Sequence, residues 1–471
     1  MTQSLNRAAI YFGAMGASQV LTFILLPLIT HFLSPEIYGE YVLALTVSSL
    51  VGMIGSTWIR NVSMRLYVDA KQSQETRSFF WNIALLQALL FSSLYGIALL
   101  MLWLLPLGLA SLESLVTAGI AILIGDFFSL GLNFTRVEEQ SVGYAIAETG
   151  SAVIRFLGTL GGLFLGFYSP SMLFIAMSVS YLLGSFYVTH LLNGSLSGSL
   201  RLEPALLKSV LRLGPASIPL SISTWVEQLA DRLVLERFTT VALVGIYSAS
   251  YALADRLLGG IIAAVFMMAW PDILNAWNQG GASAARLAIF RAQQLYAWLT
   301  LGPALFIGVF HREIVMLLSP DFREAASVIP IIVAATWLRG FIPYLNRHFE
   351  LRKAFAKMSF ITSIGALLNL TFNLLFIPRW SIMGAAWATL GAHIIVGIIF
   401  LWLRDRDQPL PLNDYFKATL IAGLAWLMSL ALPAIPLLQM AIFVTIYALG
   451  AYVGYLRPLL KQRDPPSYTS T

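Results

Sequence analysis

Long runs of apolar residues, separated by short polar connections, occupy most of the 471-residue chain. A helix of about 20 residues is needed to cross the roughly 30 Å hydrocarbon layer of a bilayer. Fourteen runs have about this length, and the pattern predicts transmembrane helices near 8–30, 40–59, 80–104, 112–134, 143–167, 171–193, 213–236, 242–268, 290–310, 325–346, 355–377, 381–403, 415–432 and 434–456. The longest connections, 60–79 and 194–212, leave no room for a domain outside the membrane.

Composition leads to the same fold class. Hydrophobic residues make up 58% of the chain and charged residues only 11%, whereas a soluble domain carries about 25% charged residues. The first apolar run is too long for the core of a signal peptide, so we count it as helix 1. We therefore expect an all-α polytopic membrane protein with about fourteen transmembrane helices.

The sequence lacks the residues of several kinds of catalytic site. It contains no cysteine, which excludes a disulfide framework, a thiol nucleophile and a thiolate metal site. Its five histidines are far apart, and no glycine-rich phosphate-binding loop of the P-loop type is present. We expect no cofactor, no metal site and no catalytic residue, and hence a protein that is not an enzyme.

The basic residues lie mostly on one side of the predicted spans. The side of the N-terminus carries 21 of them, and the opposite side carries four, namely Arg237, Arg312, Arg323 and Arg379. By the positive-inside rule, both termini are cytoplasmic, which agrees with an even number of spans. The net charge of +6 then reflects the cytoplasmic face and its contact with anionic lipids, and it gives no reason to expect nucleic acid as a partner.

Charged residues also occur inside the predicted spans. Four are basic and five acidic: Arg155, Arg232, Arg256, Arg339, Asp126, Glu148, Glu227, Asp231 and Asp255. Arg60 lies at the cytoplasmic mouth of the second span. A charge at the centre of a lone helix costs about 2.5 to 3.5 kcal/mol, so these side chains must face a wet cavity or one another.

Two of these charges are neighbours in the stretch "ASYALADRLLGG", residues 249–260. Asp255 and Arg256 point about 100° apart on a helix and cannot form an ideal pair, so each needs another partner. Candidates across a helix interface are Glu227, Asp231 and Arg232. Glu148 and Arg155, two turns apart on one face, are a second candidate pair.

The chain also repeats itself. "FLSPEIYGEY" (32–41) and "FTTVALVGIY" (238–247) align Phe32 with Phe238, Gly39 with Gly245 and Tyr41 with Tyr247 at an offset of 206. This predicts two parallel six-helix lobes, 1–200 and 201–410, followed by two extra helices and a cytoplasmic tail in 411–471. Parallel repeats with a cavity between them are typical of transporters that work by alternating access.

Three stretches carry a resemblance to a known family: "LLPLITHFLSPEIYGEYVLA" (25–44), "LADRLVLERFTTVALVGIYSASYALADRL" (229–257) and "NLLFIPRWSIMGAAWATL" (373–390). Together and in this order they resemble Wzx-type oligosaccharide flippases of the multidrug/oligosaccharidyl-lipid/polysaccharide exporter superfamily. The resemblance implies a flippase of the bacterial inner membrane. It would move undecaprenyl-diphosphate-linked repeat units, for O-antigen or exopolysaccharide, from the cytoplasmic to the periplasmic leaflet, next to polysaccharide polymerase machinery.

"YALADRLLGGIIAAVFMMAWPDI" (251–273) is also similar to the lipid II flippase branch of this superfamily, whose eighth helix carries a functional arginine in the cavity. The similarity maps that role onto Asp255 and Arg256, with Arg60 as a weaker match to a second cavity arginine. The first helix departs from that branch, since its interior offers Gln19 and no arginine. Lipid II flippase and multidrug or cation exporter remain the alternative functions.

The residues expected to bind substrate follow from its chemistry. A guanidinium binds a diphosphate bidentately, so Arg256 is the expected anchor at mid-membrane. Other cavity cations and polar or aromatic contacts to the sugar are Arg60, Arg155, Arg339, Asp255, Gln19, Asn369, Asn373, Trp225 and Tyr251. Buried carboxyl groups that exchange a proton or a sodium ion are candidates for coupling: Asp126, Glu148, Glu227 and Asp231.

The predicted orientation can be tested because the chain has no native cysteine. Single cysteines at Ser34, Ser169 and Ser319 are expected to react with an impermeant maleimide added outside the cell. Cysteines at Ser73 and Ser197 are expected to stay unlabelled until the membrane is opened. The reverse pattern would overturn the orientation and the direction of transport.

Overall fold

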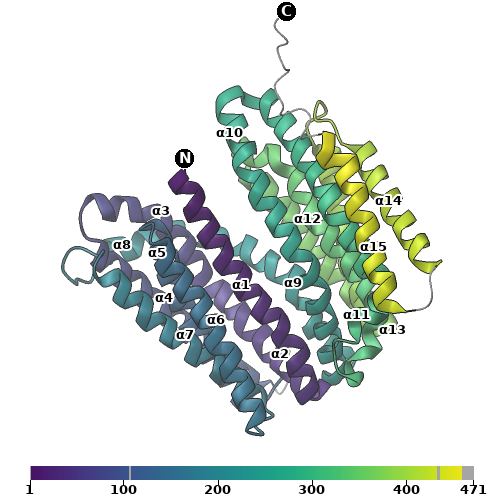
Figure 1. The fold of residues 1–471 in the computed structure, drawn as a ribbon. Coiled ribbons are helices and arrows are strands. Elements are labelled where there is room, and N and C mark those ends of the chain that lie inside the picture. Colours follow the sequence, from purple (N-terminus) through teal and green to yellow (C-terminus); the bar gives the residue numbers. More distant parts are fainter. Residues whose placement is uncertain (1, 106–107, 432–434, 459–471) are drawn as a thin grey trace, which may run out of the picture. The chain divides into compact units, whose positions relative to one another are not determined.

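The computed structural model describes residues 2–105, 108–431 and 435–458, and within these ranges all regular elements are helical (Figure 1). The α-helices are α1 (Thr2–Phe32), α2 (Pro35–Gly52), α3 (Trp58–Gln72), α4 (Thr76–Leu104), α5 (Leu112–Val137), α6 (Ser141–Phe164), α7 (Pro170–Asn193), α8 (Pro204–Leu213), α9 (Ile218–Phe238), α10 (Val241–Val309), α11 (His311–Val315), α12 (Ile329–Leu351), α13 (Phe355–Leu403), α14 (Leu412–Leu430) and α15 (Pro436–Ala451). Two π-helical turns, η1 (Met53–Thr57) and η4 (Tyr452–Leu456), and two 3₁₀ segments, η2 (Pro215–Ser217) and η3 (Pro320–Val328), complete the order. The all-α polytopic class is confirmed.

The helices account for the predicted spans. Nine helical segments within the described ranges are long and apolar enough to cross a membrane. Two of these, α10 and α13, contain one interior break each, at Gly281 and Ser381, and each covers two predicted spans. Helices α6, α9 and α14 coincide with three more of the predicted spans. The predicted boundary between the last two spans falls at 432–434, outside the described residues, as does the tail from 459 onward.

Several predicted connections are helical instead. The segment 269–289 was expected to separate two spans, but α10 runs through it and breaks only at Gly281, where φ is 63°. The second half of the segment, after Gly281, is rich in the helix former alanine, and a positive φ that ends a helix favours glycine. Similarly, the connection 194–212 contains the amphipathic helix α8, and α3 fills most of 60–79.

The connection 311–324, which is predicted to lie on the outer side, is built from the short elements α11 and η3. Within it Arg312 is exposed, whereas Ser319 is only 7% exposed and its backbone N–H lies 3.4 Å from Thr30 Oγ1. Arg312 is therefore a better position than Ser319 for an externally labelled cysteine.

The chain forms two compact units. The first comprises Met1–Ala249, Leu318–Phe322 and Ala366–Ala385, and the second comprises Ser250–Leu317, Arg323–Gly365 and Ala386–Thr471. The chain passes from the first unit to the second inside α10, after Ala249. The division into sequence-repeat lobes at residue 200 stays a prediction.

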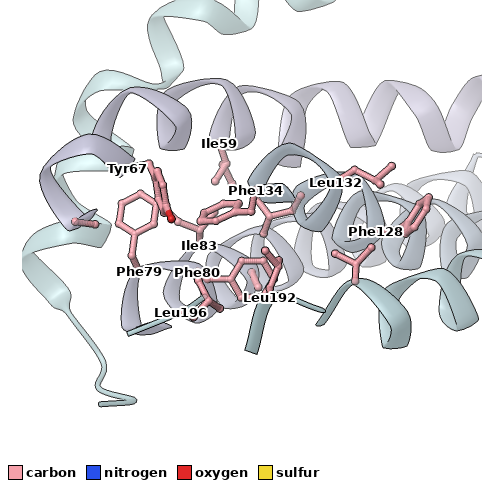
Figure 2. Packing of buried hydrophobic residues seen from close by; sticks show 14 of the residues in the cluster. Ile59, Tyr67, Phe79, Phe80, Ile83, Phe128, Leu132, Phe134, Leu192 and Leu196 are labelled. Atoms are coloured by element: carbon pink, nitrogen blue, oxygen red, sulfur yellow. The ribbon is translucent and has the colours of Figure 1, made fainter. Parts of the chain in front are cut away.

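The core of the first unit is aromatic where α3, α4, α5 and α7 meet. Phe134 of α5 lies edge-on to Tyr67 and Phe80, with ring centroids 4.9 and 5.1 Å apart, and Phe79 packs beside them (Figure 2). Edge-to-face aromatic pairs add about 0.5 to 1.5 kcal/mol to the burial of their area. Because membrane helices gain no hydrophobic driving force from one another, such specific packing is what holds the bundle together.

In the second unit, the last two helices pack against each other (Figure 1). Hydrogen bonds join both of them to α10. Asp414, in the first turn of α14, accepts hydrogen bonds of 2.9 Å from Trp298 Nε1 and from Gln294 Nε2. Tyr447 of α15 donates its hydroxyl to the Trp298 carbonyl at 2.7 Å. These bonds fix the two C-terminal helices that the sequence pattern predicts.

A charged loop follows α13 at its expected cytoplasmic end. Asp405 lies 3.0 Å from Arg286 and 3.4 Å from Arg352. Partial burial pushes the pKa of Asp405 upward, but hydrogen bonds from Arg286 and the Asp407 N–H, with the charges of both arginines, outweigh it and lower the pKa. The loop thereby links α10 to α12.

The two repeated glycines face one another in the first unit. A Cβ atom on Gly39 of α2 would overlap the carbonyl oxygen of Val241, and one on Gly245 of α10 would overlap that of Pro35. Pro35 and Val241 are themselves 206 positions apart, so the contact is reciprocal: each copy of the motif presents its glycine to the same carbonyl of the other copy. The two copies of the repeated motif thus contact each other at the starts of α2 and α10, in a local pseudo-two-fold arrangement.

Replacing either glycine by alanine is expected to destabilise the protein equally, because both changes drive a methyl group into backbone. Overpacking of this kind costs about 1 to 3 kcal/mol. We expect Gly39→Ala and Gly245→Ala to lower the unfolding temperature of the purified protein to a similar extent. Gly16→Ala on α1, where nothing lies within 4 Å of the new methyl, is the matched control and is expected to be neutral. An unchanged unfolding temperature in both test variants would contradict the contact.

Candidate functional site

A buried ion pair joins Arg60 of α3 to Asp126 near the middle of α5. The Ser56 hydroxyl donates to the other carboxylate oxygen of Asp126, and the second guanidinium nitrogen of Arg60 lies 3.3 Å from Thr57 Oγ1. Ser56 and Thr57 belong to the π-turn η1, which separates α2 from α3. Single π-turns inside helices occur frequently at functional sites, and this one places a hydroxyl and a guanidinium on the same carboxylate.

The pair changes the interpretation of Arg60. We expected this arginine at the mouth of a span that ends near residue 59, but α3 continues beyond it to Gln72, and only 16% of its side chain is exposed. Only 11% of the Asp126 side chain is exposed. A predicted substrate ligand and a predicted coupling acid are therefore partners.

A small polar cavity lies among α1, α5, α6 and α7. It has a volume of about 190 Å³, and its lining residues are Ser18, Phe128, Ser129, Leu132, Glu148, Ser151, Ala152, Arg155 and Tyr181. Arg155 donates to Thr22 Oγ1 at 2.8 Å and to the Tyr181 hydroxyl at 3.4 Å. Glu148 and Arg155 thus share a cavity, as their spacing predicts, but the bonds of Arg155 go to hydroxyl groups of neighbouring helices.

Asp231 and Arg232 are almost fully buried on α9, at 2% and 5% exposure. Asp231 receives the Arg232 guanidinium at 2.6 Å and the Tyr247 hydroxyl at 2.7 Å. The bonds of Asp231 go to its own neighbour and to the start of α10. The expected contact of Glu227 or Arg232 with Asp255 or Arg256 stays a prediction. This arrangement holds α9 against the repeated motif.

Three other predicted sugar contacts, Trp225, Asn369 and Asn373, are buried. Trp225 is 4% exposed and donates its indole N–H to the Thr46 carbonyl at 3.2 Å and to Ser49 Oγ at 3.1 Å, which joins α9 to α2. Asn373 and Asn369 are buried and lie 3.0 Å apart through their amides. Gln19 is exposed on α1. The sugar contacts assigned to these residues stay predictions.

In the second unit, Asp255 is neutralised by Arg339 of α12, with Thr336 Oγ1 at 3.3 Å from the same carboxylate oxygen. Sequence spacing did not indicate this partner, because it lies 84 positions away. Arg256 and Tyr251 belong to the same part of α10, with Tyr251 buried and Arg256 half-buried.

Arg347 is a buried cation that the sequence pattern placed in a cytoplasmic connection. It lies inside α12 at 3% exposure, forms an ion pair with Glu350, and its guanidinium stacks 4.3 Å from the ring of Trp270 and 4.8 Å from that of Phe266. Aromatic faces stabilise desolvated cations, which explains how this charge is tolerated. The two aromatics at i and i+4 on α10 were the available sequence signal.

Comparison with known proteins identifies the fold. No family model matches the sequence. An uncharacterized membrane protein of Methanocaldococcus jannaschii is 25% identical over 181 residues, which are 37% of this chain and 35% of that protein. The match therefore spans about a third of the length of this curated relative.

Solved structures align over nearly the whole chain. The lipid II flippase MurJ in an inward closed conformation has a TM-score of 0.78 at 13% identity, covering 95% of this chain and 99% of that one. An inward-facing multidrug resistance MATE family transporter of the MOP superfamily scores 0.65 at 14% identity, with 82% and 93% covered. A MOP superfamily transporter from Pyrococcus furiosus scores 0.51 at 14% identity, with 85% and 94% covered. The chain has the fold of these transporters.

Breaking the Arg60–Asp126 pair on one side is expected to destabilise the protein, because a charge is then left buried without its partner. We expect Arg60→Met or Asp126→Leu alone to lower the free energy of unfolding by about 3 to 5 kcal/mol, and the double variant to regain most of this loss. Thermal unfolding of the purified protein measures both.

The matched control is the exposed pair Arg7–Glu139, whose side chains are 40% and 66% exposed. Glu139→Gln should cost less than about 1 kcal/mol, because solvent screens exposed pairs. Additive losses in the Arg60 and Asp126 double variant would show that the two residues are not coupled.

Proposed function

We propose that the protein is a flippase that moves an undecaprenyl-diphosphate-linked oligosaccharide from the cytoplasmic to the periplasmic leaflet of a bacterial inner membrane. The observation that carries the proposal is the trio of charges on α10 and α12. Asp255 forms an ion pair with Arg339, and the half-buried Arg256, which follows Asp255 in the sequence, places a second guanidinium in the same part of a transporter fold. Such a charge is costly in a bilayer and is a functional feature by default.

The chemistry of the guanidinium favours a diphosphate as the group it meets. Arginine remains charged at any physiological pH and can donate two parallel hydrogen bonds to phosphate oxygens. The printed name of the structurally similar MurJ is that of a flippase for lipid II. The three stretches resembling oligosaccharide flippases favour a sugar repeat unit in place of lipid II.

In the first unit, Arg60 is available to an anion only in competition with Asp126. A diphosphate that approaches Arg60 must either bind the edge of the guanidinium that faces Thr57 or displace the carboxylate. Protonation of Asp126 removes the competing charge, which gives one route from an ion gradient to substrate binding. Glu148, in the cavity that also contains Arg155, is the second candidate for coupling.

A multidrug or cation exporter is the alternative function. It is favoured by the shared fold with a MATE transporter and by carboxylates in both units. An organic cation would bind the acids, and the arginines would only neutralise them. Arg256 would therefore favour substrate binding in a flippase and oppose it in an exporter of organic cations.

Substitution of Arg256 separates the two. With the protein in nanodiscs, native mass spectrometry against an added lipid-linked oligosaccharide is expected to show a loss of affinity of about 10-fold to 100-fold for Arg256→Ala, because a charged hydrogen bond contributes about 1.5 to 3 kcal/mol. Arg256→Lys should recover part of the affinity, since it keeps the charge and loses the bidentate geometry. Flipping in proteoliposomes should fall in the same order.

Arg379→Ala is the matched control, because Arg379 is an exposed arginine on α13. Unfolding temperatures of all three variants separate loss of binding from loss of fold. Normal affinity and flipping by correctly folded Arg256→Ala would overturn the proposal. Tighter binding of an organic cation by the same variant would establish the exporter alternative.

A further inference from the structure

A second cavity lies away from these charges, among α4, α5 and α7 of the first unit. Its volume is about 340 Å³, within the range of about 300 to 1,000 Å³ that is usual for small-molecule sites. Its walls are largely apolar and its lining contains no charged residue: Trp81, Ala84, Gln87, Ala88, Leu123, Ile124, Phe127, Leu182, Ser185, Phe186 and Thr189. A charged head group finds no partner there.

Two polar side chains of this cavity have no hydrogen-bond partner. Gln87 of α4 is 2% exposed, and both its amide nitrogen and its amide oxygen are buried and unpaired. Ser185 of α7 is 5% exposed, and its hydroxyl is unpaired as well. An unsatisfied buried polar group costs about 1 to 3 kcal/mol, so an occupant that supplies a hydrogen bond gains this free energy.

The cavity opens onto a surface of the protein that we expect to face lipid, because it lies on predicted membrane spans. Phe186 and Leu182, which line it, are 66% and 43% exposed. Neighbouring exposed residues of α4 and α7 are also apolar, among them Leu85, Leu89 and Leu183. A molecule dissolved in the bilayer can therefore enter from the side.

We propose that this cavity binds a neutral single-chain lipid that carries one hydroxyl group, such as a long-chain or polyprenyl alcohol. The hydroxyl donates to Gln87 Oε1 and accepts from Gln87 Nε2 or from Ser185. The chain lies against Trp81, Phe127 and Phe186. The volume fits one chain segment and is too small for a two-chain phospholipid with its head group. The site does not depend on the proposed flippase function.

The experiment uses the full-length protein in detergent and a long-chain alkanol that carries a photoreactive diazirine on its chain. Crosslinked peptides are expected from α4, α5 and α7. Unlabelled alkanol should compete at least about tenfold better than the alkane of the same length, because one hydrogen bond to a buried polar group is worth about 1.4 kcal/mol. The alkyl phosphate should compete poorly, because the cavity has no cation.

Two sets of variants test the assignment. Ala88→Trp should block labelling by filling the cavity, whereas Leu89→Trp, one position away at a 57% exposed site, should not. Gln87→Leu combined with Ser185→Ala removes the unpaired groups, so it should fold well and lose the tenfold preference for alkanol over alkane. Equal competition by alkane, or labelling that survives Ala88→Trp, would overturn the proposal and leave Gln87 and Ser185 as partners of a trapped water.

Discussion

The structure depends on one constraint, the high cost of an unpaired charge or polar group where no water is present. Four intramembrane charges, Asp126, Asp231, Asp255 and Arg347, are stabilised in different ways. Asp126 is held by an arginine and a hydroxyl from a π-turn, Asp231 by its own neighbour and a tyrosine, and Asp255 by an arginine from another helix. Arg347 uses aromatic faces in addition to a carboxylate. These pairings decide which helices must touch, in a medium where apolar contacts alone do not distinguish one helix from another.

The helical class and the positions of the membrane spans follow from the sequence because hydropathy over about 20 residues is a strong signal. The ends of helices do not follow as well. The segment 269–289 is polar enough to resemble a loop and contains Pro271, yet the helix continues through it as far as Gly281. Hydropathy indicates where a chain segment leaves the hydrocarbon layer of the membrane. The end of the helix itself is indicated only by residues that favour a turn.

Partners across helices were the least predictable part of the site. Asp255 and Arg339 are 84 positions apart, and Arg60 and Asp126 are 66 positions apart, so no periodicity within one helix connects them. The sequence pattern missed the buried Arg347, and the pairing of the other charges depends on how helices pack, which a single sequence does not record. The repeat was more informative, because the same offset that aligns the two motifs also relates Gly39 and Gly245, which the fold brings into contact.

The π-turn at Met53–Thr57 makes one stretch of the chain sensitive to length as well as to residue type. A π-turn accommodates one residue more than an α-helical turn, and each residue of an α-helix corresponds to about 100° of rotation. Deleting a single residue there would restore an ordinary helix and turn Arg60, with the rest of α3, by about that angle away from Asp126. Composition and hydropathy would hardly change. Relatives of this chain that differ by a one-residue gap at this point would thus differ in electrostatics, although an alignment would score the gap as minor.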